Sequence, residues 1–188
     1  MPTPHSTDNY VIGKGVLWIA SWTGMTPPTD PDDYYEMGNC PSVEVEPQVE
    51  RLPHYSSRAS IRLKDKNPVI ESNYMVNVEC DEMAAINLSK YLMGGITPNA
   101  LGGGTVHAMT SPDQEYALKF VADNPAGAST WKTWKFWRGT IQPNGALQLI
   151  GEEWLAMSFQ FEGLADAANN PNSQYFDVEY ATTTSTTT

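Results

Sequence analysis

Short segments in which apolar and polar residues alternate make up most of the chain, and glycine and proline residues fall between them. Alternation with a period of two is typical of strands that bury one face, and frequent turn residues favour antiparallel connections. We therefore predict a mainly β fold, an antiparallel two-sheet sandwich or barrel. The predicted strands cover residues 10–20 and 42–46, a brief alternating piece over 60–64, and then residues 69–80, 115–123, 130–141, 147–150, 154–163 and 174–180. Residues 143–145 predict a hairpin turn between two of them.

Two of these segments also predict which side chains face away from the core. In the second predicted strand the two valines point one way, while Glu44 and Glu46 point the other. In the fourth, Ile70 shares a face with three later apolar residues, and Glu71 and Glu79 lie on the opposite face. We expect these four glutamates to face solvent or to line a polar space.

A single segment changes to helical spacing. Asp81 is a candidate N-cap, and Ala85, Leu88 and Leu92 recur on one side of a helix. Two glycines that follow can adopt the left-handed ending of a helix. We predict one helix over about 82–93, lying as a flank on a sheet.

The domain organisation follows from length and local composition. A chain of 188 residues favours one domain, which we place at 10–180 after an N-terminal arm over 1–9. Residues 47–67 are mostly polar and turn-prone, so we predict a long loop there, and loops of that length are usually functional or disordered. The Thr-rich tail over 181–188 has a composition that does not drive burial.

Charge excludes one class of function. The chain has 11 Lys and Arg against 22 Asp and Glu, a formal net charge of −11, which argues against sequence-reading DNA binding through a basic patch.

No apolar run approaches the roughly 20 residues of a membrane helix. The first residues lack the features of a secretory signal, which favours cytoplasmic synthesis. Cys40 and Cys80 are therefore interpreted as small buried thiols, with a disulfide as the minor alternative.

Motifs of catalysis and of metal or nucleotide binding are not recognisable in the sequence. The three histidines are scattered, and no nucleophile elbow, phosphate-binding loop or dinucleotide fingerprint occurs. Glu152, Glu153 and Glu162 offer a candidate carboxylate pair for a hydrolase, but adjacent residues of a strand point to opposite faces. We expect no enzymatic activity, no cofactor and no metal.

A tryptophan cluster is the strongest candidate for a contact surface. Trp131, Trp134 and Trp137 recur in one predicted strand, where Trp134, Phe136 and Arg138 share one face. Aromatic rings and arginine are enriched where proteins meet. The three tryptophans are candidates for a subunit interface, for a sugar-stacking platform, or for burial on both sides of a sandwich.

Four segments, in chain order, carry a resemblance to a known family. They cover residues 11–18, 37–45 running into 50–57, 74–88, and 154–166. The most specific is the strand-to-helix sequence YMVNVECDEMAAINL, placed after a Leu-x-His-Tyr-Ser-Ser segment. The chain resembles the tail tube proteins, or major tail proteins, of long-tailed, siphovirus-like bacteriophages.

This resemblance implies a structural virion protein with two packed β-sheets, a flanking helix and a long polymerisation loop. Such proteins form hexameric rings that stack into a hollow tail tube, through which double-stranded DNA passes into the host. One sheet of each subunit then contributes to the lumen wall. The implied partners are further copies of the chain, the tape measure protein, and the terminator and baseplate proteins. The implied location is the virion, after assembly in the bacterial cytoplasm.

The resemblance also assigns candidate sites. An acidic lumen would repel phosphates, and the candidates are Glu44, Glu46, Glu71 and Glu79, with outer solvent as the alternative location. The candidates for contacts between rings are Arg51, Leu52, His54 and Tyr55. The candidates within the ring interface are Trp131, Trp134 and Trp137. Alternative functions are another tail ring component, such as a terminator or baseplate protein, and a Trp-rich carbohydrate-binding β module.

Overall fold

A computed structural model describes residues 13–24, 26–57, 61–100, 102–123, 130–152 and 154–182, with backbone only for 130, 131 and 180–182. The arm predicted over 1–9 and most of the Thr-rich tail lie outside these residues. The described residues form twelve strands, all paired antiparallel, and one helix. The predicted mainly β, antiparallel fold is therefore confirmed.

In chain order the elements are β1 (Gly15–Ser21), β2 (Tyr35–Glu36), β3 (Ser42–Arg51), β4 (His54–Ser56), β5 (Leu63–Lys66), β6 (Val69–Cys80), α1 (Ala85–Tyr91), β7 (Ile96–Pro98), β8 (Gly104–Val106), β9 (Glu115–Ala122), β10 (Thr130–Pro143), β11 (Met157–Gly163) and β12 (Phe176–Thr182).

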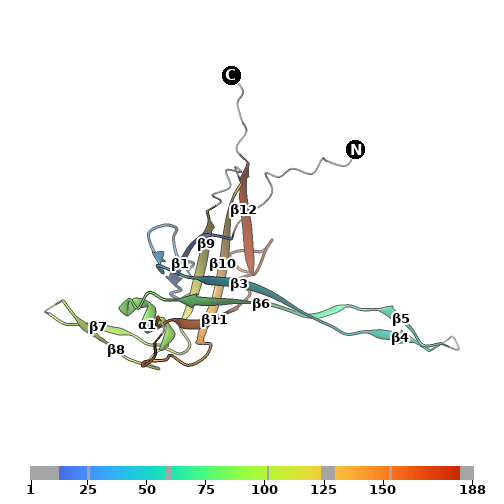
Figure 1. Cartoon of the computed structure of the whole chain (residues 1–188). Coiled ribbons are helices and arrows are strands. Elements are labelled where there is room, and N and C mark those ends of the chain that lie inside the picture. The colour runs from blue at the N-terminus through green and yellow to red at the C-terminus, as the bar shows by residue number, and fades with distance from the viewer. Residues whose placement is uncertain are drawn as a thin grey trace, which may run out of the picture.

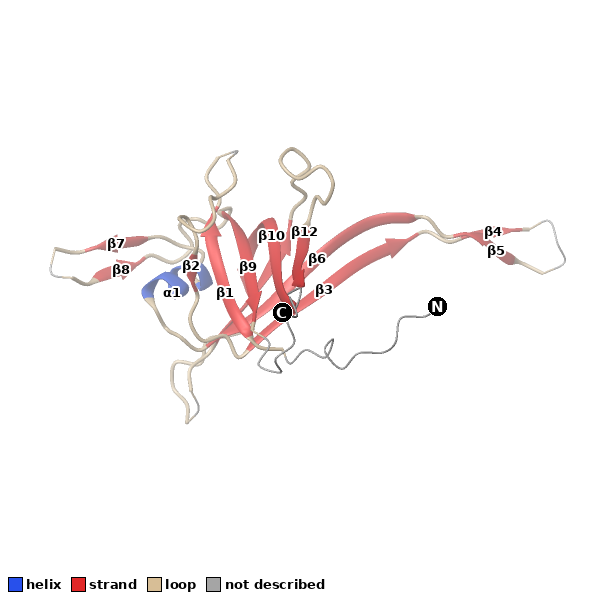
Figure 2. Cartoon of the chain, turned by 90° about the horizontal axis from the view of Figure 1, so that it is seen from above, coloured by secondary structure: helices blue, strands red, loops and turns tan. Residues whose placement is uncertain are grey.

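The long strand β10 joins two halves of one sheet. Its first part pairs with β12 from Thr130 to Phe136, and its last part pairs with β11 from Gly139 to Pro143. On its other side β10 pairs with β9, with a bulge between Phe136 and Gly139. One half therefore holds β2, β1, β9, β10 and β12, and the other holds β10, β11, β6 and β3 (Figure 2).

The hydrophobic core lies between these halves. Leu17, Ile19 and Leu118 contribute from the first half, and Val76 and Phe159 contribute from the second. All five are at most 1% exposed. Alternate residues of β6 and β11 are buried, as expected for strands with one face on a core. The helix α1 flanks the second half and contacts β10 and β11.

Two strands continue beyond the core as an arm. β3 and β6 pair along their whole length, from Ser42 opposite Glu79 to Arg51 opposite Val69, and β4 and β5 prolong the ribbon. The arm projects from one side of the body (Figure 1). The prediction of a loop over residues 47–67 is therefore wrong. Solvent reaches both faces of this ribbon, so its strands can form without an alternation of apolar and polar residues. Pro47 is compatible with it since β3 is an edge strand.

Several other boundaries differ from the predictions. The helix is shorter than 82–93, and Asp81 is not its N-cap, because its carboxylate accepts a hydrogen bond from Asn39 Nδ2 at 2.6 Å. The strand predicted over 147–150 is wrong: it lies in the connection from β10 to β11, whose described residues contain no strand. The tight turn predicted over 143–145 is replaced by this longer connection.

Candidate functional site

The sheet half that carries the arm presents one wide polar face. Residues opposite one another in an antiparallel register share a face, so β3, β6, β11 and the end of β10 contribute to it together. Six exposed glutamates belong to this surface, which we name the carboxylate face: Glu44, Glu46, Glu50, Glu71, Glu79 and Glu162.

No positive side chain lies within the strand segments that make up the face, since β3 carries its one cation, Arg51, at the end that enters the arm. The sequence contains no Lys or Arg in residues 42–50, 69–80, 139–143 or 157–163. The face therefore carries a formal charge of −6. A single-sign field of this kind repels other anions over the distance that salt permits, about 8 Å at physiological ionic strength.

Amide side chains connect the strands across the middle of the face. Gln142 Nε2 donates a hydrogen bond to Gln160 Oε1 at 2.9 Å, and Gln160 Nε2 donates to Asn77 Oδ1 at 3.0 Å. Asn73 Nδ2 donates to Glu162 Oε1 at 3.3 Å. These contacts fix the centre of the face on three neighbouring strands, and Glu44 lies opposite Asn77 at its margin.

The structure brings the four predicted glutamates onto this one face. Glu44, Glu46 and Glu79 lie in the part of the β3–β6 ribbon nearest Ser42, while Glu71 lies opposite Glu50 near its other end. Ile70, predicted to point into the core, is 54% exposed because it lies on the arm. Glu162 was not predicted as part of the face, although its alternation with Phe161 and Gly163 is the signal that could have placed it.

The predicted inter-ring residues lie on the arm. Arg51 donates a hydrogen bond from a guanidinium nitrogen to Asn67 O at 3.2 Å, and His54 Nδ1 lies 2.6 Å from Asp65 Oδ1. Leu52 is 60% exposed, and Tyr55 is 40% exposed. The arm thus presents both apolar and polar groups to its surroundings.

Two of the three candidate tryptophans, Trp134 and Trp137, have side chains that the structure describes, and the two contact different neighbours. Trp134 stacks on Phe136 at 6.3 Å between ring centroids, and Trp137 Nε1 donates to Ser173 O at 2.9 Å. Both are half-buried, and the side chain of Trp131 lies outside the described residues. The prediction that Arg138 shares a face with Trp134 and Phe136 is wrong, because the bulge shifts the alternation by one residue.

Two open hollows adjoin the tryptophans. The larger, about 660 Å³, lies where the sandwich is open, between Val43 and Val45 of β3 and Phe120 and Trp134 of the facing half. A smaller hollow of about 240 Å³ is lined by Trp137 and other residues.

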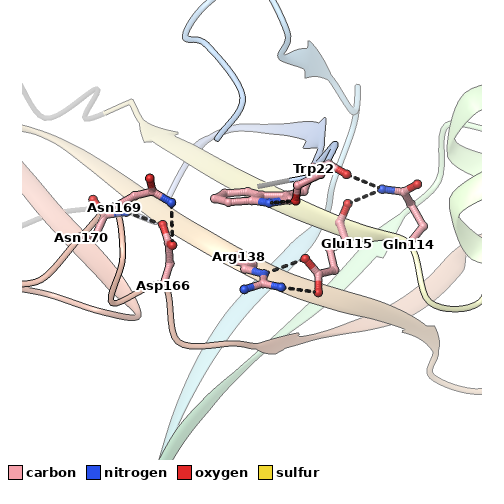
Figure 3. A network of polar contacts seen from close by, with 8 residues as sticks. Trp22, Gln114, Glu115, Arg138, Asp166, Asn169 and Asn170 are labelled. Atoms are coloured by element: carbon pink, nitrogen blue, oxygen red, sulfur yellow. Dashed lines mark hydrogen bonds and ion pairs between the residues drawn. The ribbon is translucent and has the colours of Figure 1, made fainter. Parts of the chain in front are cut away.

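An ion pair connects the start of β9 to the bulged part of β10 (Figure 3). Arg138 donates from Nε and one terminal nitrogen to the two carboxylate oxygens of Glu115, at 2.6 and 2.8 Å. These hydrogen bonds raise the pKa of Arg138. Gln114 Nε2 donates to the carbonyls of Trp22 and Glu115, at 2.8 Å each, and so adds the end of β1 to the network.

Asp166 forms the second centre of this network (Figure 3). It is 3% exposed, and its carboxylate accepts hydrogen bonds from Asn169 Nδ2 and Asn170 Nδ2 at 2.8 Å each. Its backbone amide donates to Gln174 O at 2.8 Å. All these contacts hold the connection from β11 to β12 in place, which is a structural role.

The two cysteines are free thiols, as expected. Cys80 is buried, while Cys40 is half-buried. The neighbouring Cys80 thiol and burial raise the pKa of Cys40. Sequence spacing gave no sign of the contact, because it depends on how β3 and β6 pair.

Among the described residues no group of three or more His, Cys, Asp or Glu side chains is arranged to hold a metal ion. In the same residues no helix is long and apolar enough to cross a membrane. Of the carboxylates considered for a hydrolase, Glu152 lies on an exposed connection, Glu162 lies on the carboxylate face, and Glu153 lies outside the described residues.

Fold and site together define a class: an antiparallel β protein with one flanking helix, a projecting two-stranded arm and a carboxylate-lined sheet face. The chain belongs to the family described as "Protein of unknown function UCP028589", whose model matches residues 10–106 and 99–179. A comparison with curated proteins found no match.

Proposed function

We propose that the protein is the tail tube subunit of a long-tailed, siphovirus-like bacteriophage. In this proposal it forms hexameric rings that stack into a hollow tube in the virion, after assembly in the bacterial cytoplasm. Double-stranded DNA passes through the tube, and the tape measure, terminator and baseplate proteins are the other partners. The observation that carries the proposal is the carboxylate face on a four-stranded sheet half with open edges.

The edges of this sheet half support side-by-side assembly. β3 is its terminal strand, and β9 ends its pairing with β10 opposite Thr140, which leaves the last residues of β10 without a partner on that side in the described chain. Unpaired edges are sites for pairing with another chain, and closure into a barrel removes them.

Simple geometry gives the size of such a barrel. Four strands from each of six subunits make 24 strands. With a spacing of about 4.8 Å and a tilt of about 40°, they enclose a barrel roughly 50 Å wide between backbones, or about 40 Å between side chains. A DNA duplex fits through this opening without touching the wall.

The charge of the face supports DNA passage rather than DNA binding. Six glutamates in each of six subunits place 36 formal negative charges around one ring. Proteins that bind DNA neutralise phosphates with Lys and Arg, and the strand segments that make up this face have none. The wall therefore repels the duplex at short range and keeps it free to slide.

The arm supports stacking of the rings. Leu52, Ile61 and Leu63 are 60%, 69% and 58% exposed, which is unusual for apolar side chains grouped on one projection. Exposed apolar groups of this kind mark a surface that contacts another protein.

Negative-stain electron microscopy across a concentration series tests the proposal. We expect hollow, six-fold tubes from the intact chain. Replacing residues 52–67 by an Asn-Gly turn should leave a folded protein that does not form tubes, as judged by circular dichroism and microscopy. The matched control replaces residues 99–103, the tip of the β7–β8 hairpin, by the same turn and should still form tubes.

Two outcomes would count against the proposal. Rings that never stack would favour a terminator or baseplate ring protein instead. Tubes of normal length from the variant without the arm would contradict the role given to the arm.

A further inference from the structure

The cations of the chain are concentrated on the arm. Residues 51–66 contain five of the 11 Lys and Arg and one of the 22 Asp and Glu. This segment has a formal charge of +4, from 5 − 1, and the rest of the chain has −15, from 6 − 21. Four of these five cations, Arg51, Arg62, Lys64 and Lys66, lie on the described part of the arm, which is thus basic beside an acidic body.

The described side chains of this segment make a surface that is both basic and apolar. Lys64, Lys66 and Arg62 are exposed, and the Arg62 guanidinium lies 4.6 Å from the centre of the Tyr55 ring. Leu63 is exposed beside them. We name this surface, with Arg51 and Leu52, the basic arm tip.

An acidic counterpart lies in the segment from residue 30 to residue 36, which contains Asp30, Asp32, Asp33 and Glu36. Asp30 pairs with Lys119. Among the described residues no ion pair involves the other three carboxylates. Asp33 accepts a hydrogen bond from a backbone amide nearby, and Asp32 and Glu36 are exposed. We name this segment the acidic loop.

A hollow with a mixed polar and apolar lining adjoins the acidic loop. It measures about 350 Å³, and Pro27, Pro28, Tyr35 and Ile86 line it together with Asp33 and polar residues. Lys90 also lines it, with its ammonium 4.6 Å from the centre of the Tyr116 ring. The apolar part of the hollow offers space for an apolar side chain close to the Asp33 carboxylate, which matches the mixed apolar and basic composition of the basic arm tip.

We infer that the basic arm tip docks on the acidic loop and its hollow in a second copy of this chain. Within one copy the two surfaces cannot meet, because the arm projects from one side of the body while β2 and its loop lie on the other (Figures 1 and 2). A contact between two different surfaces of the same molecule is head-to-tail, so it continues from copy to copy as a ring or a stack.

The carboxylate face is a poorer partner for the tip. Glu50 and Glu71 of that face are opposite one another at the base of the arm, and the proposed function turns the face toward the lumen. The inference rests on the proposed function in that it names the two surfaces that join subunits. It makes the further claim that opposite charge selects this pair of surfaces.

Charge reversal on each side tests the pairing. Lys64→Glu with Lys66→Glu places acidic groups opposite the acidic loop, and Asp32→Lys with Asp33→Lys places basic groups opposite the basic tip. Like charges across an interface strongly oppose association, so each double variant alone should raise the concentration needed for assembly at least about tenfold. Sedimentation velocity measures this concentration. For the intact protein, 1 M salt should also raise the concentration needed for assembly, since the electrostatic screening length falls to about 3 Å.

Two further samples show whether the two surfaces meet each other. A mixture of the two double variants, and the single chain that carries all four substitutions, should both assemble again. Lys14→Glu with Lys132→Glu is the matched control, because it makes the same change of charge away from the arm and should assemble like the intact protein.

The inference is overturned if the arm variant assembles normally, or if neither the mixture nor the fourfold variant recovers. It is also overturned if the intact tip instead binds a 30-base-pair duplex or phosphatidylglycerol vesicles and the charge reversals leave self-association unchanged. Hollow tubes that ignore the substitutions would keep the proposed function and reject this contact. Head-to-tail complexes that recover on mixing but never form hollow rings would keep the contact and reject the proposed function.

Discussion

Gly163 lies where β11 pairs with β10 just beyond the bulge, and Gly163→Ala should destabilise the fold. Its ladder partner is Gly139, so no side chain separates the strands at this corner. A Cβ added at Gly163 would lie 2.0 Å from Cε1 and 2.3 Å from Cζ of Tyr74, far inside van der Waals contact. Either the Tyr74 ring or the strand must move.

The surroundings of Tyr74 prevent an easy adjustment. Its side chain is 1% exposed, and its ring centroid lies 5.6 Å from that of Phe136 and 5.2 Å from that of Phe176. Its hydroxyl donates to Tyr175 O at 3.3 Å. Overpacking costs about 1–3 kcal/mol, and loss of one hydrogen bond costs about 1 kcal/mol. We expect a total of about 2–4 kcal/mol, or a fall in Tm of roughly 4–15 °C for a chain of this length.

Urea unfolding followed by tryptophan fluorescence measures this loss. Gly13→Ala is the matched control, since no atom of the described residues lies within 4 Å of a Cβ placed there, and it should change stability by less than about 0.5 kcal/mol. Adding Tyr74→Leu to Gly163→Ala should give a loss smaller than the sum of the two single losses. Equal stabilities for Gly163→Ala and Gly13→Ala would refute this reasoning.

Three further predictions concern charge. Burial raises the pKa of Tyr116 from 10.0 to about 12. The unfolded chain therefore releases the Tyr116 proton at a lower pH than the folded chain does. The free energy of unfolding falls as pH rises from 10 to 12, by at most about 1.4 kcal/mol per pH unit for this residue. Urea unfolding of Tyr116→Phe should show a smaller decrease over the same pH range. A double-mutant cycle of Arg138→Met and Glu115→Gln, measured by urea unfolding, should give a coupling energy of about 1 kcal/mol. A value near zero would mean that this bidentate ion pair does not stabilise the fold. In assembled tubes, Glu46→Lys with Glu162→Lys should make DNA cosediment with the tubes at low salt and detach at high salt, whereas intact tubes should leave it in the supernatant; no difference would remove the role of the face.

The sequence predicts best where a strand lies on the core. The alternation over residues 69–80 predicts the bounds of β6, because one buried face forces a period of two. The same parity predicts that Glu44, Glu46, Glu71 and Glu79 point away from the core. Once strands are aligned, these positions fall on one face without further information.

The failures occur where tertiary contacts or solvent decide the structure. The arm over 47–67 buries neither face, so its strands have no periodic signal. Asp81 is of a residue type that is favoured at the N-cap, but its carboxylate is hydrogen-bonded to Asn39, which is 42 residues away. The bulge before Gly139 moves Arg138 to the other side of β10, and no residue type near it in the sequence indicates a bulge.

The most direct test of the account is a cryo-electron microscopy reconstruction of the assembled protein at a resolution that separates strands and side chains. We predict a closed inner barrel of 24 strands, built from β10, β11, β6 and β3 of six copies, with Glu44, Glu46 and Glu162 pointing into the lumen. A tube with these glutamates on its outer surface, or an assembly with no closed barrel, would contradict the account.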